Sequence, residues 1–215
     1  MHSLNEISNR LTLAIHSTDS SYGFAYRLND DDKSDKFFIR NLQNDLCNNL
    51  VQDFNEFVSN KNFKKINRIS VSTGPANFNA SRLIVVLART IAQQIKCPLE
   101  SFSCFELMSK RIAINNICEN TKSFWIYNKL KKKGFIAGQY EIVHLDKESE
   151  TIEIREKIIP KVFQELKDIK PCFQANYDDK KDLKELLNFS SKNIKTLSQK
   201  SWEDVLPLYP ISPVN

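Results

Sequence analysis

The fold is decided by the first ordered stretch of the chain, residues 11–28, which reads LTLAIHSTDSSYGFAYRL. An apolar run at 11–15 is followed by a polar turn at 16–21, and apolar residues nearly alternate over 22–28. Alternation with a period of two is typical of a strand in a sheet, so this stretch predicts a β-hairpin. The chain therefore begins with antiparallel strands.

Helices and strands alternate after the hairpin. Hydrophobic periodicity and turn residues predict a turn at 30–33, a strand at 36–40, an amphipathic helix at 42–58, a strand at 66–72, a helix to about Lys96, a strand at 99–102 and a helix at 104–114. Asn77 or Asn79 is the expected N-cap of the second helix. The order β-β-β-α-β-α-β-α is that of the ribonuclease-H-like unit on which actin-like ATPases and sugar kinases are built. We therefore expect an α/β protein with an actin-like fold, two subdomains and mixed sheets.

The second half predicts another, irregular α/β subdomain. Expected strands lie at 123–128, 134–145 and 151–159, and expected helices at 160–169 and 180–188. We place the division between residues 1–110 and 111–215. The last segment, 202–215, has Pro207, Pro210 and Pro213, which favour an extended tail and exclude a helix. Its apolar residues favour packing on the body of the protein over a role as an SH3-type ligand.

Composition sets limits on the class of protein. The 215 residues include 31 Lys and Arg against 26 Asp and Glu, a formal charge of +5, and 41% are hydrophobic. These values suit a packed protein and exclude a disordered or collagen-like chain. The longest run of large apolar residues, 83–88, ends at Arg89 and is too short to span a bilayer. Residues 1–10 lack the apolar core of a signal peptide, so we expect no membrane attachment and a cytoplasmic location.

The five cysteines do not indicate a disulfide framework. Their number is odd, they are widely spaced and they form no CxxC pair. Neither disulfides nor a zinc knuckle is implied, and we expect reduced thiols.

Four segments together carry a resemblance to a known family. They are LTLAIHST at 11–18, STGPANFNASRL at 72–83, CPL at 97–99 and PLY at 207–209. Together they resemble the TsaB family, also called YeaZ, the bacterial non-catalytic partners in the synthesis of threonylcarbamoyladenosine on tRNA. The family form of the central motif is GPGSFTGLR. Five residues of the corresponding segment, here named the motif loop, are Gly74, Pro75, Asn77, Phe78 and Arg82, of which all but Asn77 match the family form.

The departures from the family pattern lie in the same segments. The family usually has Asp after the first strand, where this chain has His16. The two later glycines of the motif are replaced by Ala76 and by Ala80 or Ser81. The resemblance covers about residues 11–110 and the last ten residues, and the second subdomain looks diverged.

The sequence offers little support for catalysis. In the actin-like superfamily the carboxylate after the first strand helps to hold hydrated Mg²⁺, a role for which His16 is unsuited. Four glycines in the whole chain leave few turns that could approach a phosphate closely. His2, His16 and His144 are far apart and form no metal-binding motif. Cys104 is better interpreted as a buried thiol than as a nucleophile. We therefore expect no catalytic residue, no metal and no cofactor.

The helix expected after the motif loop is the best candidate for partner binding. On a helical wheel, Val85 and Val86 fall outside the core stripe, on the side of Arg82, Arg89 and Gln93. These five residues are here named the partner face. The predicted helix at 42–58 is the alternative cover for this apolar surface. The resemblance implies pairing with a TsaD-type catalytic subunit in a heterodimer, or with a second copy in a homodimer, through a helical bundle.

Three functions remain open at this point. The first is a non-catalytic subunit for tRNA modification, which would bind the TsaD-type subunit, meet tRNA indirectly and have a TsaE-type ATPase as a further candidate partner. The second is an autonomous enzyme of the same fold, a small-molecule kinase or a peptidase. The third is a direct tRNA-binding module, supported by the lysine run Lys129, Lys131, Lys132 and Lys133, for which a solvated loop is the simpler interpretation.

Overall fold

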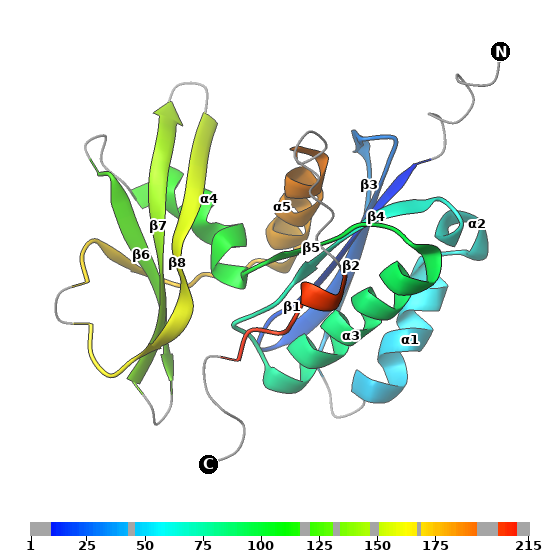
Figure 1. Cartoon of the computed structure of the whole chain (residues 1–215), viewed down its shortest axis with the longest axis horizontal. Helices are drawn as coiled ribbons and strands as arrows, with labels where there is room; N and C mark the ends of the chain where they lie inside the picture. Colours follow the sequence, from blue (N-terminus) through cyan, green and yellow to red (C-terminus); the bar gives the residue numbers. More distant parts are fainter. Residues whose placement is uncertain are drawn as a thin grey trace.

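The computed structural model describes residues 10–42, 46–116, 121–130, 134–146, 151–166, 169–192 and 202–209. Figure 1 shows two units side by side along the long axis of the molecule, each built around a sheet. One sheet has five strands in the order β3-β2-β1-β4-β5, and the other has four in the order β8-β7-β6-β9. Each sheet contains both parallel and antiparallel pairs. The expected α/β fold with two mixed sheets is confirmed.

The first sheet is formed by the strands expected from the opening stretch and by two later ones. They are β1 (Leu11–Ser17), β2 (Ser21–Leu28), β3 (Asp31–Asn41), β4 (Ile66–Ser72) and β5 (Leu99–Phe102). The pairs β1–β2 and β2–β3 are antiparallel, and β1–β4 and β4–β5 are parallel. Every residue of β1 is buried, because helices cover both faces of this central strand.

The turn between β2 and β3 is tighter than expected. Asn29 and Asp30 both have positive φ, of 55° and 57°, as the two central residues of a type I′ hairpin turn do. The strand β3 already begins at Asp31, so the turn expected at 30–33 is shorter and one residue earlier. Asn and Asp tolerate positive φ better than most side chains, which explains why the turn forms there.

Among the described residues, five α-helices surround the two sheets. They are α1 (Leu46–Phe57), α2 (Asn60–Phe63), α3 (Phe78–Ile95), α4 (Cys104–Asn116) and α5 (Asp179–Lys192). The helix α3 begins where expected: Asn77 is its N-cap and accepts a hydrogen bond from the Ala80 N–H at 3.1 Å. It ends at Lys96, which adopts the left-handed conformation common at helix C-termini. None of the described helices is both long and apolar enough to cross a membrane.

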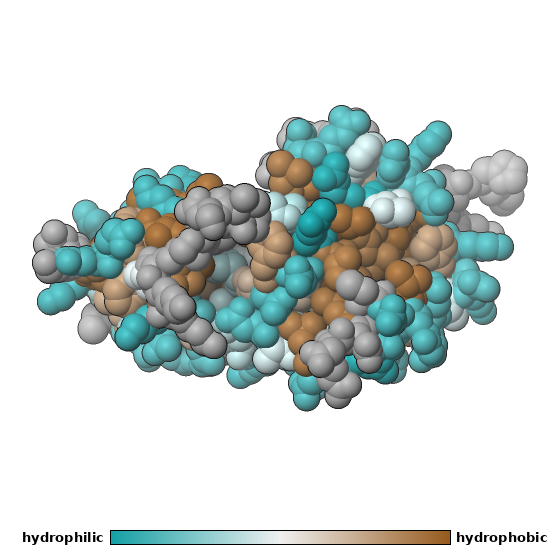
Figure 2. All heavy atoms as spheres, turned by 90° about the horizontal axis from the view of Figure 1, so that it is seen from below, coloured by the Kyte–Doolittle hydropathy of each residue, from teal (hydrophilic) through white to brown (hydrophobic). Residues whose placement is uncertain are grey.

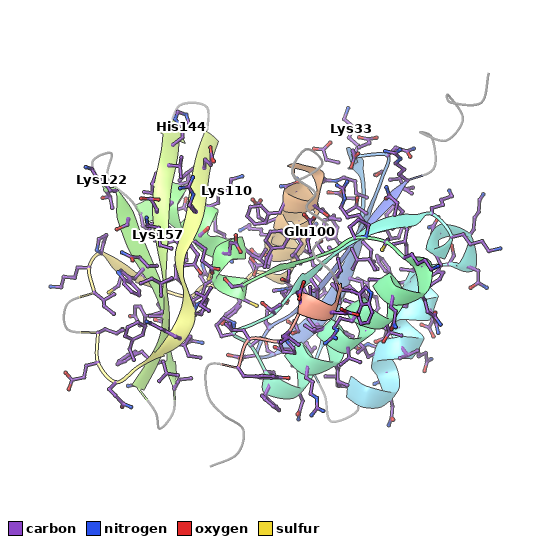
Figure 3. All side chains as sticks on the ribbon, viewed as in Figure 1. Lys33, Glu100, Lys110, Lys122, His144 and Lys157 are labelled. Atoms are coloured by element: carbon purple, nitrogen blue, oxygen red, sulfur yellow. The ribbon has the colours of Figure 1, made fainter. Side chains whose placement is uncertain are left out.

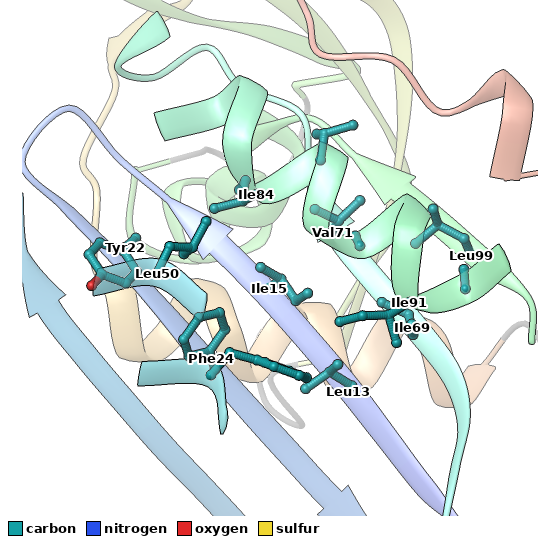
Figure 4. Packing of buried hydrophobic residues seen from close by; sticks show 14 of the residues in the cluster. Leu13, Ile15, Tyr22, Phe24, Leu50, Ile69, Val71, Ile84, Ile91 and Leu99 are labelled. Carbon is teal, nitrogen blue, oxygen red and sulfur yellow. The ribbon is translucent and has the colours of Figure 1, made fainter. Parts of the chain in front are cut away.

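The main core lies between the first sheet and the helices α1 and α3. Figure 4 shows Ile84 and Ile91 of α3 in one cluster with Ile15, Ile69 and Val71 of the sheet. Phe24 of β2 packs in this core against two aromatic rings of α1. The centroid of its ring lies 5.5 Å from that of Phe54 and 6.2 Å from that of Phe57. Burial of one such side chain stabilises the fold by about 1.5–3 kcal/mol.

The opposite face of the first sheet is covered by α5. Ala14 and Ala25 are fully buried in a small cluster with Leu183, Leu186 and Leu187. Alanines on this face leave room for the helix to lie close to the sheet. The helix α5 comes from the second half of the sequence, yet it packs against β1, β2 and β4.

The second sheet is formed by β6 (Ser123–Leu130), β7 (Gly134–Asp146), β8 (Thr151–Phe163) and β9 (Cys172–Gln174). The helix expected at 160–169 is wrong. The strand β8 continues through Pro160 to Phe163, and Phe163 pairs with Phe135 of β7. This is an edge strand, where a proline without an N–H is tolerated. The short strand β9 was not expected.

The chain does not divide cleanly at one residue. The helix α4 packs on the second sheet through Phe105, Met108 and Ile112, although it starts before residue 110. The helix α5 and the buried Val205 belong to the core of the first sheet. A boundary between residues 110 and 111 falls inside α4. It assigns the strands of the two sheets to different halves of the chain, but α5 and Val205, which follow it, pack on the first sheet.

Candidate functional site

The motif loop connects β4 to α3 and has an unusual backbone. Gly74 has φ of +105°, and the Gly74–Pro75 peptide bond is cis. Few side chains tolerate that φ, so this position requires glycine. The Gly74 carbonyl accepts a hydrogen bond from the Cys104 N–H at 2.6 Å, and the Pro75 carbonyl accepts one from the Tyr177 hydroxyl at 2.9 Å. The loop is therefore fixed from both α4 and the segment that leads into α5.

The C-terminal segment also packs on the motif loop. The Leu208 N–H donates to the Thr73 carbonyl at 2.7 Å, and the rings of Phe78 and Tyr209 lie 5.0 Å apart. Val205 is buried in the main core. Packing of the tail on the body is confirmed for residues 202–209, and residues 210–215 lie outside the described chain. Contrary to expectation, the segment begins with a single 3₁₀ turn, η3 (Trp202–Asp204), which ends before Pro207.

The partner face on α3 is narrower than the sequence predicts. Val85 is completely buried in the main core, so its assignment to an outer surface is wrong. The buried residues of α3 span a wide arc, because the helix contacts both the sheet and neighbouring segments. They are Ala80, Ser81, Ile84, Val85, Ala88, Ile91 and Ala92.

Four of the five residues remain at the surface of α3. Val86 is 51% exposed, Arg82 and Gln93 are exposed and Arg89 is half-buried. They recur at intervals of three or four residues and so lie along one side of the helix. Val86, Arg89 and Gln93 border a shallow hollow of about 220 Å³ together with Thr90 and Trp202. Arg82 lies one turn nearer the start of α3 and does not line this hollow.

Two contributors to this surface were missed by sequence reasoning. Trp202 of η3 covers Arg89, whose guanidinium carbon lies 5.7 Å from the ring centroid. Val51 of α1 is 53% exposed. The sequence could have indicated the exposure of Val51, because this residue lies outside the apolar stripe of its helix. No local pattern in the sequence indicates that Trp202 is a neighbour of Arg89. Figure 2 shows a broad hydrophobic area on the side of the molecule where α1 and α3 lie in Figure 1.

A second candidate region lies at the C-terminal end of β1, where α4 and α5 meet the strand. His16 is completely buried within the strand, not in an exposed turn, and its Nε2 lies 3.6 Å from Oδ2 of Asp182 on α5. Among the described residues, neither ring nitrogen has a hydrogen-bond partner. The same carboxylate pairs with Arg111, whose Nη1 lies 2.5 Å from Oδ1, and it accepts the Asp178 N–H at 3.1 Å. Arg111 and Asp182 thus form a largely buried ion pair between α4 and α5.

Two hydroxyl groups close to His16, those of Thr18 and Ser21, bond to protein groups, whereas the buried Ser17 hydroxyl has no hydrogen-bond partner among the described residues. Thr18 Oγ1 and Ser21 Oγ are 2.6 Å apart, and Ser21 donates to Asp179 at 2.7 Å. In this fold a magnesium ion with a nucleotide would need free oxygen ligands here. Both Asp182 oxygens and the hydroxyls of Thr18 and Ser21 already have protein partners, so these groups are not free to hold such an ion. Within the described ranges, no three His, Cys, Asp or Glu side chains are placed to hold a metal ion.

Cys104 is a buried thiol beside this region. It is fully buried, and its Sγ lies 3.6 Å from the Ser17 carbonyl oxygen. Burial, followed by the nearby Asp182 carboxylate, raises the pKa of this thiol well above its ordinary value. A thiol held in the neutral form is a poor nucleophile. The interpretation of Cys104 as a buried structural thiol is confirmed.

Lys129, the described member of the lysine run for which a solvated loop is the simpler interpretation, lies at one end of the second sheet. Lys129 is exposed on β6, whereas Lys131, Lys132 and Lys133 lie outside the described residues. The second sheet is distant in the fold from α3, as Figure 1 shows. Lys129 and the partner face therefore belong to different surfaces.

Comparisons with solved structures give a match along nearly the whole chain. The structure of YeaZ from Pseudomonas aeruginosa superposes with a TM-score of 0.62 at 12% identity, over 93% of this chain and 99% of that one. A second structure, described as an uncharacterized protein with similarity to peptidase YEAZ from Pseudomonas aeruginosa, gives a TM-score of 0.64 at 13% identity, over 94% and 100%. No protein-family model and no curated protein matches the sequence. At these identities the likeness is one of fold, and it extends through both subdomains.

Proposed function

We propose that this chain is a TsaB-type (YeaZ) subunit that supports the synthesis of threonylcarbamoyladenosine on tRNA by binding a TsaD-type catalytic subunit. The observation that carries the proposal is the end-to-end match to YeaZ, with both subdomains included. The motif loop supports it, because Gly74 holds a positive φ that an ordinary side chain would disfavour. A shared fold alone does not specify a function, so the argument also rests on the surface of α3.

The surface of α1 and α3 has the character of a docking site. Val86 and Val51 are each more than half exposed, whereas the other described large apolar residues of α1 and α3 are buried or half-buried apart from Phe78, which is 38% exposed at the start of α3. Charged and polar groups flank Val86, namely Arg82, Arg89 and Gln93. An apolar centre with a polar rim is the usual anatomy of a protein interface. A helical bundle formed with the partner would remove both valines from water.

The proposal assigns the chain no reaction of its own. His16 and Cys104 are buried, and the thiol is held neutral by its surroundings. The hydroxyls of Thr18 and Ser21, just after β1, already form hydrogen bonds within the protein. The autonomous-enzyme alternative predicts turnover of Mg²⁺-ATP or a peptide by the purified chain. Turnover that is lost in His16→Ala, with folding retained, would replace the non-catalytic proposal with that alternative.

The docking experiment uses size-exclusion chromatography of the chain with and without a TsaD-type subunit. Val86→Glu should abolish co-elution, because an unpaired carboxylate buried in an interface costs several kcal/mol. In the free subunit the introduced carboxylate could still reach water, so the thermal melt of the variant should match that of the wild type. Val143→Glu is the matched control, since Val143 is 45% exposed on the second sheet.

The possible outcomes of this experiment are distinct. Loss of co-elution in Val86→Glu alone supports docking through α3. Co-elution of Val86→Glu at the wild-type level would place the interface elsewhere. The wild-type chain analysed alone tests the homodimer, and the addition of a TsaE-type ATPase tests the wider assembly.

A further inference from the structure

One face of the second sheet carries a group of aromatic side chains. The pairing register places Trp125 and Tyr127 of β6 on the same face as Phe135 of β7 and Phe163 of β8. All four side chains are half-buried. The other face of this sheet holds Phe124 and Ile126, which pack with α4 in the second core. Figure 1 shows α4 lying across the sheet. These four rings are here named the aromatic face.

The four rings form two pairs, and a small residue, Ala137 of β7, lies among them. Trp125 and Phe163 meet edge to face with centroids 5.6 Å apart, and Tyr127 and Phe135 do so at 5.9 Å. Ala137 pairs with Tyr127 on one side and Lys161 on the other, and it is completely buried. A small residue at this point lets large rings from β6 and β8 approach each other over β7.

Basic side chains border the aromatic face. Lys129 is exposed next to Phe135 in the register, and the Lys161 Nζ lies 5.4 Å from the centroid of Phe163. Further along the same face, Arg155 and Lys157 both lie within 4 Å of the single carboxylate of Glu141. Figure 3 shows Lys157 on this sheet. With Glu153 included, these basic groups number four against two acidic ones, and Glu141 lies one same-face pair along from Trp125 in the register.

We propose that the aromatic face binds an unpaired segment of RNA, with bases stacked on the accessible parts of these half-buried rings and phosphates near Lys129 and Lys161. Rings on an open sheet, bordered by cations, suit bases that are splayed out of a helix. The choice of RNA over DNA rests on the proposed function, in which tRNA is the molecule modified. The face would then let this subunit contact tRNA directly, which extends its role beyond docking.

The charge and the rings make separable contributions. Lysine alone gives weak binding that falls steeply with salt, with a slope of about 0.7 per phosphate contact for single strands. Stacking on an aromatic ring adds affinity for any base and is less sensitive to salt. An A-form duplex hides its bases inside the stack and should bind less tightly than a single strand. These differences define the test.

The first measurement is fluorescence anisotropy of a labelled single-stranded RNA of about 12 nucleotides, a length within the range of sheet-type binding sites. The isolated full chain should bind it with a dissociation constant of roughly 1–100 μM. A duplex of the same sequence and single-stranded DNA are the comparison probes. Tyr127→Leu should weaken binding of the single-stranded RNA about tenfold through loss of stacking. Tyr209→Leu removes a partly exposed tyrosine from the C-terminal segment and should not weaken it.

The lysines are tested by the salt dependence. Lys129→Ser/Lys161→Ser should reduce the slope of log K against log salt by about 1.4, two phosphate contacts at about 0.7 each. Lys61→Ser/Lys64→Ser removes the same charge from positions at α2, remote from the second sheet, and should leave the slope at its wild-type value. A slope that changes equally in both variants would mean binding through net charge alone and would overturn the proposal.

Tryptophan fluorescence gives an independent readout. The chain has two tryptophans, so Trp202→Phe leaves Trp125 as the sole indole. Stacking of a base should quench its emission as RNA is added. Absence of RNA binding by the wild type, or binding that survives Tyr127→Leu without quenching of Trp125, would overturn the proposal. If Tyr127→Leu instead prevented co-elution with the TsaD-type subunit, the face would be a protein interface.

The RNA test and the docking test can fail separately. RNA binding is measured on the chain alone, whereas docking is measured with the catalytic subunit and Val86→Glu. If docking fails and single-stranded DNA binds as well as RNA, the proposed function and the choice of RNA both fall. If docking holds and RNA does not bind, only the inference about the aromatic face is overturned.

Discussion

Trp202 lies over the side chain of Arg89, with the guanidinium carbon 5.7 Å from the ring centroid. This contact joins the C-terminal 3₁₀ turn to the outer side of α3, beside Val86 and Gln93. The surface next to the partner face is therefore partly built by a segment that is remote in the sequence. Because this 3₁₀ turn covers α3 at Arg89, a partner helix that lay along α3 past that point would have to displace Trp202.

The contact between Arg89 and Trp202 should be measurable as a coupling energy. Trp202→Ala should lower the free energy of unfolding by about 1–3 kcal/mol, because the ring is partly buried against α3. A double-mutant cycle with Arg89→Ala, by urea denaturation, should give a coupling of about 0.5–1 kcal/mol. A coupling indistinguishable from zero would mean that the two side chains contribute independently.

Val85 and Val86 should differ sharply although they are adjacent and identical in type. Val85→Ala should destabilise the subunit by about 1–3 kcal/mol, because it removes two methyl groups from a fully buried site. Val86→Ala should change the stability by less than about 0.5 kcal/mol, because Val86 is 51% exposed. Urea denaturation of both variants decides the point. Equal effects would contradict the burial of one and the exposure of the other.

The ion pair between Arg111 and Asp182 should be sensitive to loss of one partner. Arg111→Met should destabilise the protein by about 3 kcal/mol, because it leaves the fully buried Asp182 carboxylate without its cation. The double variant Arg111→Met/Asp182→Asn should recover part of that loss, since the uncompensated charge is gone. Thermal melts of the two variants provide the comparison. A double variant less stable than Arg111→Met would show that the contacts of the carboxylate with His16 and the Asp178 N–H stabilise the fold by more than its unpaired charge costs.

Tyr177 should make stability depend on alkaline pH. Its hydroxyl donates to the Pro75 carbonyl, and burial, then the neighbouring Cys104, raises the pKa of Tyr177 above its usual value near 10. A raised folded-state pKa means that the contribution to stability is complete below about pH 10 and is lost as the pH rises through the folded-state pKa.

Removal of this hydroxyl tests both effects. Tyr177→Phe should cost about 1 kcal/mol at neutral pH and should lose less stability than the wild type between about pH 9 and about pH 11. Tyr209→Phe, at a partly exposed position, is the control. Parallel stability curves for Tyr177→Phe and the wild type would show that Tyr177 does not titrate differently in the folded state.

The elements of the first sheet were predictable from the sequence because their signals are local. The apolar run 11–15, the alternation at 22–28 and the N-cap Asn77 all act through neighbours in the chain. The helix expected at 160–169 failed because β8 is set by pairing with β7, which a local pattern does not contain. The three residues of β9 are held by β6 for the same reason.

The candidate site was predictable only in part. The sequence alone determined the order of the elements in the first half, the glycine that the motif loop requires and the position of the apolar helix after it, because period, capping and backbone freedom are properties of neighbouring residues. The tertiary structure decided that Val85 is buried and Val86 exposed, that Trp202 covers Arg89, and that Asp182 faces His16. Each of these depends on which distant segment packs against a helix or strand, and burial and electrostatic pairing are fixed only when those segments meet.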